Sequence, residues 1–579
     1  MIKKYITRDK FIDEFIKCLE SGKDFELSNA TVGGDISIKD IYERIKDKEL
    51  KGCKIYKEID EGIGTIVISI NINIYINNVK FNGKFEVHYE MSDIKDMGML
   101  IKVIFNKDVE FGKSIFKGKA NFVGGEFKGK VDFIDTIFEG EAYFKDNKFK
   151  RGAYFLDAKF KGGACFRKTI FEGEVMFLKA IFKETADFED AIFNKDVEFK
   201  NSIFEGVANF RNGKFEREVY FKETKFYGEV MFLKAKFKKE AYFEEAIFKN
   251  AKFIKTTFEK DANFKNTKNL KLLFGESTFN GIADFRDIYF GLLSFVDCTF
   301  ENLALFRKGK IKFKKSKKFE ISLKKPDIHW IHTIVNVINN TIKDKCLAIF
   351  LNVQFLNKHS KIENFPLSKT SFLKTDVRDV MLLCEIKKEK ILSHKLFKNG
   401  ENNKGIYKEA YTILKNHLNY NSILAEYRNL RISIENNRTY EEASDLYKME
   451  MELKKEYSKW YEKFAIILYG LISDYGESIH KPIFGIFFLI FATPFVLTLV
   501  YYLDLNSFIN NQISNIIPEF LLPYIPIYIE HLKSVLGAKF YRGNSKSLLE
   551  VIIYCLYSVF LMIVMGNLYI ALRRRLSRK

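Results

Sequence analysis

Phenylalanine recurs between Val103 and Phe306 at alternating steps of five and six residues, and this rhythm limits the possible folds more than any other feature of the chain. The repeating unit is therefore eleven residues long. A small apolar residue stands two positions before every second Phe, as at Ala120, Val131, Ala142, Ala153, Ala164, Val175, Ala186, Val197, Ala208, Val219, Val230 and Ala241. A repeat of fixed period over this length is typical of a solenoid.

Neither a helix nor a flat sheet accommodates the rhythm. In a helix, steps of five and six place successive Phe side chains on two faces about 140° apart. The glycines inside the array, such as Gly118, Gly162 and Gly206, would each cost a helix about 1 kcal/mol. In a flat strand, a step of five sends neighbouring Phe side chains to opposite faces. Both can point inward only if the backbone turns a corner between them.

A chain that turns a corner after each short strand forms a tube of stacked parallel coils. We expect interior columns of Phe, with glycine and Asn at corners where φ is positive. No Pro precedes Pro326, which fits a continuous ladder of backbone hydrogen bonds. If two repeats make one coil, the array holds about nine coils and is about 43 Å long.

Several repeat strings resemble pentapeptide-repeat proteins, in the Phe-rich variant that alternates five and six residues. They include ANFVGGEF from Ala120, ADFEDAIF from Ala186 and ANFRNGKF from Ala208. The resemblance implies a mainly β fold, a right-handed quadrilateral parallel β-helix. It also implies that the central Phe and the small residue before it both point inward.

The net charge of +20 does not come from the repeats, which hold similar numbers of basic and acidic residues. Some proteins that the repeats resemble are acidic, DNA-like rods, and a balanced tube argues against that role. We do not expect nucleic acid to be a partner. The basic run from Arg307 to Lys318 is either a patch for anionic lipid or nucleic acid, or a solvated loop. Seven cysteines without a CxxC pair indicate a reduced compartment.

Segments outside the repeats lack the Phe rhythm. We predict a helix from Lys10 to Leu19, a strand from Thr65 to Ile76 and a helix from Asp327 to Leu351. The segment from Ser371 has the pattern of a few irregular coils, and Thr439 with Glu442 forms a capping box that opens a long helix. The predicted domains are an N-terminal α/β cap (1–102), the β-helix (103–306), a basic linker with a helix and degraded coils (307–400), and a helical hairpin (404–480).

Residues 482–503 and 551–572 are free of Asp, Glu, Lys, Arg and His, and each is long enough to cross a bilayer. We predict two transmembrane helices joined by an extracytoplasmic loop, residues 504–550. The basic tail, residues 573–579, and the lysines before the first span place both ends in the cytoplasm. Trp460, Tyr461, Phe464 and Tyr469 fit an interfacial belt, and Asn567 is a candidate for a hydrogen bond across the helix pair.

The C-terminal part resembles that of membrane-bound pentapeptide-repeat proteins, in the strings AEYRNLRISIENNRTYEEASDLYKMEM, YGESIHKP and ALRRRLSR. Some proteins of that group carry a two-helix, channel-like domain. The loop between the spans here contains no TxGYG filter. That departure argues against selective potassium conduction.

Motifs for catalysis and cofactor binding are missing from the sequence. No GxxxxGKS, GxGxxG or GxSxG motif occurs in the required setting. His329 and His332 could share a helical face, but no third metal ligand accompanies them. We therefore expect no enzyme activity, no catalytic residue, no cofactor, no metal and no small-molecule substrate.

Two functions fit these features. The first is a scaffold tethered to the cytoplasmic face of the inner or plasma membrane, with the bilayer and a protein as partners. The second is a homo-oligomeric pore, in which cytoplasmic repeat domains gate a channel-like membrane region; two spans cannot enclose a conduit alone.

Overall fold

The computed structural model describes residues 4–60, 63–90, 99–309, 346–384, 389–437, 439–506 and 548–577. The chain divides within helix α6 (Tyr420–Asn436) into two compact units, Met1–Glu426 and Tyr427–Lys579. The first unit is a parallel β-solenoid with helices at its ends, and the second is helical. The expected mainly β solenoid followed by helices is confirmed, whereas its right-handedness stays a prediction.

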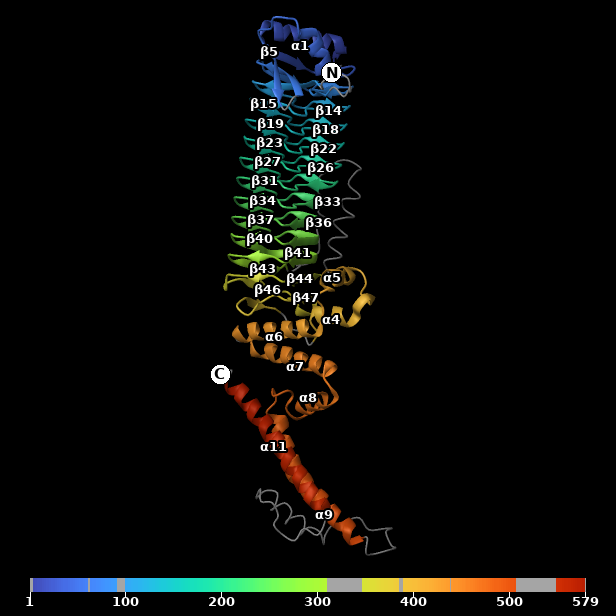
Figure 1. Ribbon diagram of the computed structural model, residues 1–579, viewed down its shortest axis with the longest axis vertical. Coiled ribbons are helices and arrows are strands. Elements are labelled where there is room, and N and C mark those ends of the chain that lie inside the picture. Colours follow the sequence, from blue (N-terminus) through green and yellow to red (C-terminus); the bar gives the residue numbers. More distant parts are fainter. Residues whose placement is uncertain are drawn as a thin grey trace, which may run out of the picture. The chain divides into compact units, whose positions relative to one another are not determined.

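Each coil contains four short strands, and every strand pairs in parallel with its equivalent on the next coil (Figure 1). Ala120 pairs with Ala142, so one coil takes two eleven-residue repeats, as expected. The first face comprises β12 (Val109–Glu110), β16 (Val131–Asp132), β20 (Ala153–Tyr154), β24 (Val175–Met176), β28 (Val197–Glu198), β32 (Val219–Tyr220), β35 (Ala241–Tyr242) and β38 (Ala262–Asn263). The second comprises β13 (Ile115–Phe116), β17 (Ile137–Phe138), β21 (Lys159–Phe160), β25 (Ile181–Phe182) and β29 (Ile203–Phe204).

The other two faces repeat in the same way. The third comprises β14 (Ala120–Asn121), β18 (Ala142–Tyr143), β22 (Ala164–Cys165), β26 (Ala186–Asp187) and β30 (Ala208–Asn209). The fourth comprises β15 (Glu126–Phe127), β19 (Lys148–Phe149), β23 (Ile170–Phe171), β27 (Ile192–Phe193), β31 (Lys214–Phe215), β34 (Lys236–Phe237), β37 (Thr257–Phe258), β40 (Thr278–Phe279), β42 (Thr299–Phe300) and β45 (Gln354–Phe355).

The Phe side chains form stacked columns inside the tube. Phe188 lies on Phe166 at a ring-centroid distance of 4.9 Å and on Phe210 at 5.0 Å, with ring planes 2° and 4° apart. It also meets Phe177 edge to face at 5.4 Å. All four side chains are fully buried. Because full burial of one Phe contributes on the order of 2 kcal/mol, these columns supply most of the apolar core.

Small residues fill the space beside the columns, as expected. Ala120, Val131 and their equivalents two positions before every second Phe are buried. Some of the other Phe residues are preceded at the same distance by buried polar side chains, which the Phe rhythm did not predict, and the rest by Ala or Gly. Thr136 Oγ1 donates to the Phe111 carbonyl at 2.7 Å, and Thr224 does the same to Phe199. Backbone carbonyls near the corners thus satisfy these hydroxyls, as burial of polar groups requires.

One corner residue in each repeat adopts a left-handed conformation. Asp135, Asp157, Lys179 and Asn201 occupy equivalent corners of successive coils with φ between 53° and 59°. Among the described glycines of the repeats, Gly124 alone has positive φ, so the expected role of glycine at corners is wrong for the others. Gly140 instead allows close approach, because a Cβ there would lie 2.6 Å from the Gly118 carbonyl oxygen.

The coil shortens by one residue midway along the tube. Phe226 pairs with Phe248, but Glu229 pairs with Asn250, so the spacing falls from 22 to 21 residues. Ala241 then pairs with Ala262. From this point the strands of the second and third faces run together as β33 (Lys225–Met231), β36 (Ile247–Ile254) and β39 (Lys268–Gly275). Strand β41 (Ala283–Val296) also includes the first-face strand, because Ala283 pairs with Ala262.

Stacked strands begin before the Phe rhythm does. The N-terminal elements are β1 (Lys4–Ile6), α1 (Arg8–Ser21), β2 (Phe25–Ser28), β3 (Ala30–Val32), β4 (Ile36–Ser37), α2 (Ile38–Ile45), β5 (Cys53–Asp60), β6 (Ile63–Ile70), β7 (Ile74–Asn77), β8 (Lys80–Phe81), β9 (Phe85–Glu86), β10 (Tyr89–Glu90) and β11 (Met99–Phe105). Strand β7 pairs with β2 and with β12, so the predicted strand from Thr65 to Ile76 is two strands. Helix α1, predicted from Lys10 to Leu19, covers the first coil, where Phe11 and Phe15 contact Phe25.

The solenoid continues past the predicted end of the repeats. The last coils contain β43 (Ala304–Lys308), β44 (Leu347–Leu351), β46 (Lys361–Glu363), β47 (Thr370–Ser371) and β48 (Met381–Leu383), with a 3-10 turn at Leu367–Lys369. The segment from Ser371, expected to form a few irregular coils, lies in the last coils, where β47 pairs with β44 and β48 pairs with β46. The helix predicted from Asp327 to Leu351 is wrong at its C-terminal end, because Leu347–Leu351 is a strand that pairs with β41. Residues 327–345 of that predicted helix lie outside the described residues. All five residues of Leu347–Leu351 are buried, which suits a strand covered on both sides.

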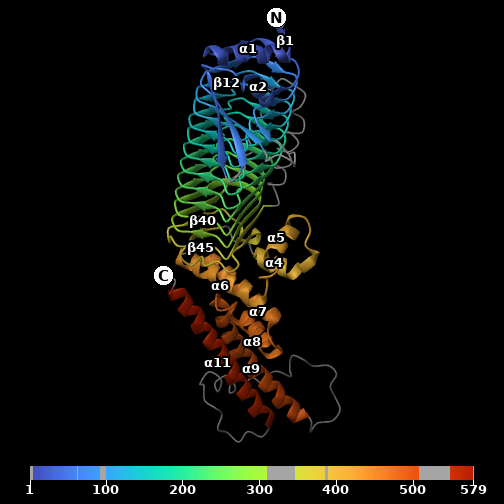
Figure 2. The same cartoon turned by 45° about the horizontal axis from the view of Figure 1, so that its top comes forward.

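Helices cover this end of the solenoid (Figure 2). Helices α4 (Leu392–Asn399) and α5 (Ile406–Leu414) lie beside the last coils, separated by a 3-10 turn at Gly400–Asn402. Glu426 of α6 is buried and accepts hydrogen bonds from the Phe372 backbone N–H and the Ser393 hydroxyl. Burial raises the pKa of Glu426 to about 7, against the lowering effect of these hydrogen bonds.

The second unit contains α7 (Tyr440–Tyr457), α8 (Trp460–Ser473), α9 (His480–Asn506) and α11 (Leu548–Ser577). Glu450 of α7 is almost fully buried and forms ion pairs with Arg428 at 3.0 Å and Lys454 at 2.9 Å. The predicted capping box is wrong, because the Thr439 hydroxyl donates to the Ile434 carbonyl and makes no cap hydrogen bond. The long helix predicted after Thr439 also breaks at Ser458, before α8.

Removing one ring should loosen several coils. We expect Phe188→Ala to cost about 3–5 kcal/mol, because the cavity also exposes the faces of Phe166 and Phe210. Amide hydrogen exchange should accelerate in β22, β26 and β30. Thr185→Ala, at an exposed position of the same coil, is the control and should leave exchange unchanged. Equal exchange in both variants would contradict the stacked core.

The buried Glu426 predicts that the C-terminal end of the solenoid loses stability as pH rises. Between about pH 4.5 and pH 7 the unfolded carboxyl ionises while the folded one keeps its proton, which costs up to roughly 3 kcal/mol. Glu426→Gln can still accept from the Phe372 N–H through its oxygen and can donate its amide N–H to the Ser393 hydroxyl oxygen; it carries no titratable group and should abolish this loss. The measurement is urea unfolding at about pH 5 and about pH 8. Glu409→Gln, at a surface ion pair with Lys271, is the control; an unchanged pH dependence in Glu426→Gln would refute the assignment.

Candidate functional site

Two helices of the second unit carry large apolar side chains on their outer surfaces. On α9, five Phe residues are 55% to 73% exposed: Phe484, Phe487, Phe488, Phe491 and Phe495. On α11 the exposed apolar residues include Leu556, Val559, Phe560, Met562, Met565, Tyr569, Ile570, Leu572 and Leu576. Contiguous apolar surface of this kind is rare on soluble proteins and marks a contact with lipid or another protein.

Within the described residues, one helix is long and apolar enough to cross a membrane. It is the segment Cys555–Leu576 of α11, with a mean hydropathy of 2.0. Its 22 residues extend about 33 Å, close to the thickness of the hydrocarbon core. The described apolar part of α9, His480–Phe495, is shorter. The predicted span 551–572 falls inside α11, and a second span at 482–503 stays a prediction.

The two apolar helices pack against each other, and a polar side chain joins them to α8. A Cβ on Gly485 of α9 would lie 3.5 Å from Val564 of α11, so the backbone of α9 passes close to α11. Asn567 of α11 accepts a hydrogen bond from the Ser473 hydroxyl of α8 at 2.9 Å and donates to the Ile563 carbonyl. The sequence predicts a bond of Asn567 across the pair of apolar helices; its interhelical bond is instead to α8.

The turn between α8 and α9 is held in an uncommon backbone conformation. Asp474, Tyr475 and Gly476 are all left-handed, with φ of 50°, 61° and 79°. The Ser473 hydroxyl accepts from the Gly476 N–H at 2.9 Å, and the Arg574 guanidinium donates to the Tyr475 carbonyl at 2.7 Å. A strained turn of this kind persists only where its surroundings hold it in place. We name Ser473, Asp474, Tyr475, Gly476, Glu477, Asn567 and Arg574 the junction.

Charged and aromatic groups complete the junction. Arg574 pairs with Glu477 at 3.2 Å, and its guanidinium lies 4.1 Å from the centre of the Tyr447 ring. The Tyr475 hydroxyl donates to Glu452 of α7, and burial together with this hydrogen bond raises the pKa of Tyr475. The junction thus ties α7, α8, α9 and α11 together at one end of the apolar pair. Sequence reasoning missed it, although an Asp-Tyr-Gly string directly before an apolar helix is a turn signal.

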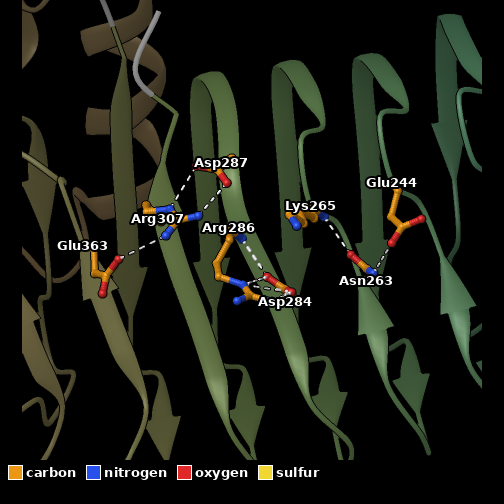
Figure 3. A network of polar contacts seen from close by, with 8 residues as sticks. All are labelled: Glu244, Asn263, Lys265, Asp284, Arg286, Asp287, Arg307 and Glu363. Carbon is orange, nitrogen blue, oxygen red and sulfur yellow. Dashed lines mark hydrogen bonds and ion pairs between the residues drawn. The ribbon is translucent and has the colours of Figure 1, made fainter.

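The outer faces of the solenoid carry charges that are paired between coils. Figure 3 shows such a network on one face, where Arg307 binds Asp287 at 2.6 Å and approaches Glu363 at 3.9 Å. Lys161 pairs with Glu139 in the same way on another coil. Each exposed pair contributes at most about 1 kcal/mol. Such pairs place opposite charges beside each other on neighbouring coils.

Most of the other candidate residues from the sequence, the histidine pair and the basic run, lie outside the described residues. These are His329, His332 and residues 310–318 of the basic run. Arg307, at the start of that run, is ion-paired, and Lys308 Nζ lies 2.9 Å from Cys346 Sγ. Within the described ranges, no group of three or more His, Cys, Asp or Glu side chains could hold a metal ion.

Comparison with known proteins identifies the repeats. Residues 155–268 match the family model for pentapeptide repeats (9 copies), in the overlapping segments 155–203, 188–233, 199–247 and 221–268. Proteins with pentapeptide-repeat β-solenoids are generally structural or scaffold proteins.

A protein of Methanocaldococcus jannaschii, named as the uncharacterized protein MJ1147, is 48% identical over 247 residues. The match covers 41% of this chain and 50% of that relative, so the chain spans about half the length of the curated relative it matches. No solved structure matches the chain. Together, the stacked coils and the family match identify residues 155–268 as pentapeptide repeats folded into a parallel β-solenoid.

Proposed function

We propose that the chain is a membrane-tethered scaffold, in which the apolar helices anchor the pentapeptide-repeat solenoid to a bilayer and the solenoid binds a protein partner. The observation that carries the proposal is the outer surface of α11, which is apolar over the thickness of a bilayer. Keeping this surface in water would be costly, and lipid chains would cover it.

The distribution of basic residues supports an orientation. Arg573 and Arg575 are exposed at the C-terminal end of α11, and Lys481 lies at the start of α9 beside the same junction. By the positive-inside rule this end faces the cytoplasm. We therefore propose that α9 and α11 form a hairpin across the inner or plasma membrane, with the solenoid on the cytoplasmic side.

The solenoid suits a binding role because its construction leaves its outer side chains free to vary. Its stability resides in inward Phe and small residues, whereas alternate side chains such as Tyr154, Glu198 and Tyr220 point outward on one face. The outward side chains on the long faces of the tube can therefore vary without affecting the packing of its core. A repeat protein of this kind binds another protein more readily than a small molecule.

The pore alternative depends on the segment between the apolar helices, of which residues 507–547 lie outside the described part of the chain. No described contact favours it over the scaffold. It remains a prediction, as do the homo-oligomer that it requires and the identity of the protein partner.

A charge on the outer surface of α11 should weaken the tether. Met565 lies near the centre of the apolar segment and is half exposed, so Met565→Asp should cost about 3 kcal/mol of insertion energy. The measurement is the fraction of full-length protein retained by membranes after an alkaline carbonate wash. Met565→Leu is the matched control and should be retained like the unmodified chain. An unmodified chain that stays in solution without detergent would end the proposal.

Conductance measurements separate the scaffold from the pore. We expect the purified full-length chain, reconstituted in planar bilayers, to leave the conductance at the level of lipid alone. Reproducible single-channel currents that disappear when the protein is omitted would contradict the scaffold and favour the pore.

A further inference from the structure

Helix α8 carries a stripe of large apolar side chains that the described residues of the second unit leave exposed. The stripe comprises Trp460, Phe464, Ile467 and Leu471, which are 80%, 63%, 39% and 71% exposed. At 100° per residue, spacings of four, three and four residues place these side chains within an arc of about 60°. The stripe therefore forms one outward face along the whole helix.

The opposite side of α8 is fixed to the rest of the unit. Buried Ser473 donates to Asn567 of α11, and the Tyr469 ring meets the Tyr475 ring edge to face at 5.9 Å. Helix α8 also packs against α7 and α9. The outward direction of the stripe is thus set by contacts on the other side of the helix.

The contact with Asn567 places α8 at one end of the apolar helix pair (Figure 1). The arginines Arg573 and Arg575 follow Asn567 by six and eight residues, about 9–12 Å along α11. The end of α8 therefore lies about two helical turns from the level where the apolar part of α11 gives way to cations. In a tethered protein that level is the boundary between hydrocarbon chains and headgroups.

Positive charge borders the stripe. Lys459 and Lys463 are both exposed and lie on one flank of it, and Tyr461 lies on the other. Long lysine side chains beside an apolar face reach outward to headgroups while their stems cover apolar surface. A helix with an apolar face, flanking lysines and interfacial aromatics is suited to lie in the plane of an anionic membrane surface.

We infer that α8 is an in-plane membrane helix whose stripe inserts into the headgroup boundary of an anionic phospholipid bilayer. The inference rests on the proposed tether and adds a second, shallow contact to it. Insertion of α8 would fix the junction, and with it the start of α9 and the end of α11, at a defined depth. Lys459 and Lys463 would contact the lipid phosphates.

Trp460 provides a direct probe of depth. The chain has two Trp residues, Trp330 and Trp460, so Trp330→Phe leaves one fluorophore on the stripe. The full-length variant is reconstituted into vesicles of phosphatidylglycerol and phosphatidylcholine that carry bromine either near the headgroup end or near the methyl end of the acyl chains. We expect blue-shifted emission, stronger quenching by the shallow bromine, and little quenching by aqueous iodide.

Two paired changes test the stripe and the charge. Leu471→Asp, on the stripe, should shift Trp460 emission back toward its value in water, whereas Ala465→Asp, exposed but off the stripe, should not. Replacing phosphatidylglycerol with phosphatidylcholine should reduce quenching by the shallow bromine, and so should the double change Lys459→Gln and Lys463→Gln.

Each outcome decides between specific alternatives. Protein that fails to enter vesicles at all would overturn the tether. Protein that stays in vesicles while iodide quenches Trp460 freely would leave the tether intact and overturn the inference. Protection of Trp460 from both iodide and bromine would mean that another copy of the chain covers the stripe, and this result would also overturn it. Equal quenching of Trp460 by bromine with and without phosphatidylglycerol would contradict the proposed contact of Lys459 and Lys463 with anionic lipid.

Discussion

Contact between aromatic rings on neighbouring coils is the interaction on which the first unit depends. A ring such as Phe188 is buried only because Phe166 and Phe210 cover its two faces, and those rings depend on their own neighbours in turn. Backbone hydrogen bonds between the same coils hold this spacing. A stack of this kind has two open ends, so covering them is a structural requirement. Helix α1 covers one end, and at the other end α4 packs against β47 and Glu426 accepts from the Phe372 N–H.

Much of the solenoid could be predicted because its core uses one distinctive residue at a fixed interval. The first coils were not predicted, because aliphatic residues such as Leu27 and Ile76 point inward there and the Phe rhythm is absent. It also missed the inward hydroxyls of Thr136 and Thr224, since their partners are carbonyls about one coil away. The long strand Ala283–Val296 could not be predicted either. The loss of one residue per coil changes the geometry of a corner but leaves the amino-acid composition of the repeats the same.

The apolar helices of the second unit could be predicted from the absence of charge, whereas the junction could not. Ser473 and Asn567 are 94 residues apart in the sequence, and only folding brings the hydroxyl to the amide. Arg574 looks like one more cation of a basic tail, yet it is turned inward onto Tyr447 and Glu477. Composition therefore located the apolar surface but not the polar contacts that orient it.

The change of coil length has a consequence for how such a rod can vary over evolution. Duplication of a 22-residue stretch before Gly228, or of a 21-residue stretch after it, inserts a complete layer whose rings meet equivalent rings above and below. Each insertion lengthens the rod by about 4.8 Å and turns no interior side chain outward. Duplications that are not a whole number of coils would break the register of every face at once. The length of the solenoid can therefore change in steps of one layer, while the sequences that cover its two ends stay the same.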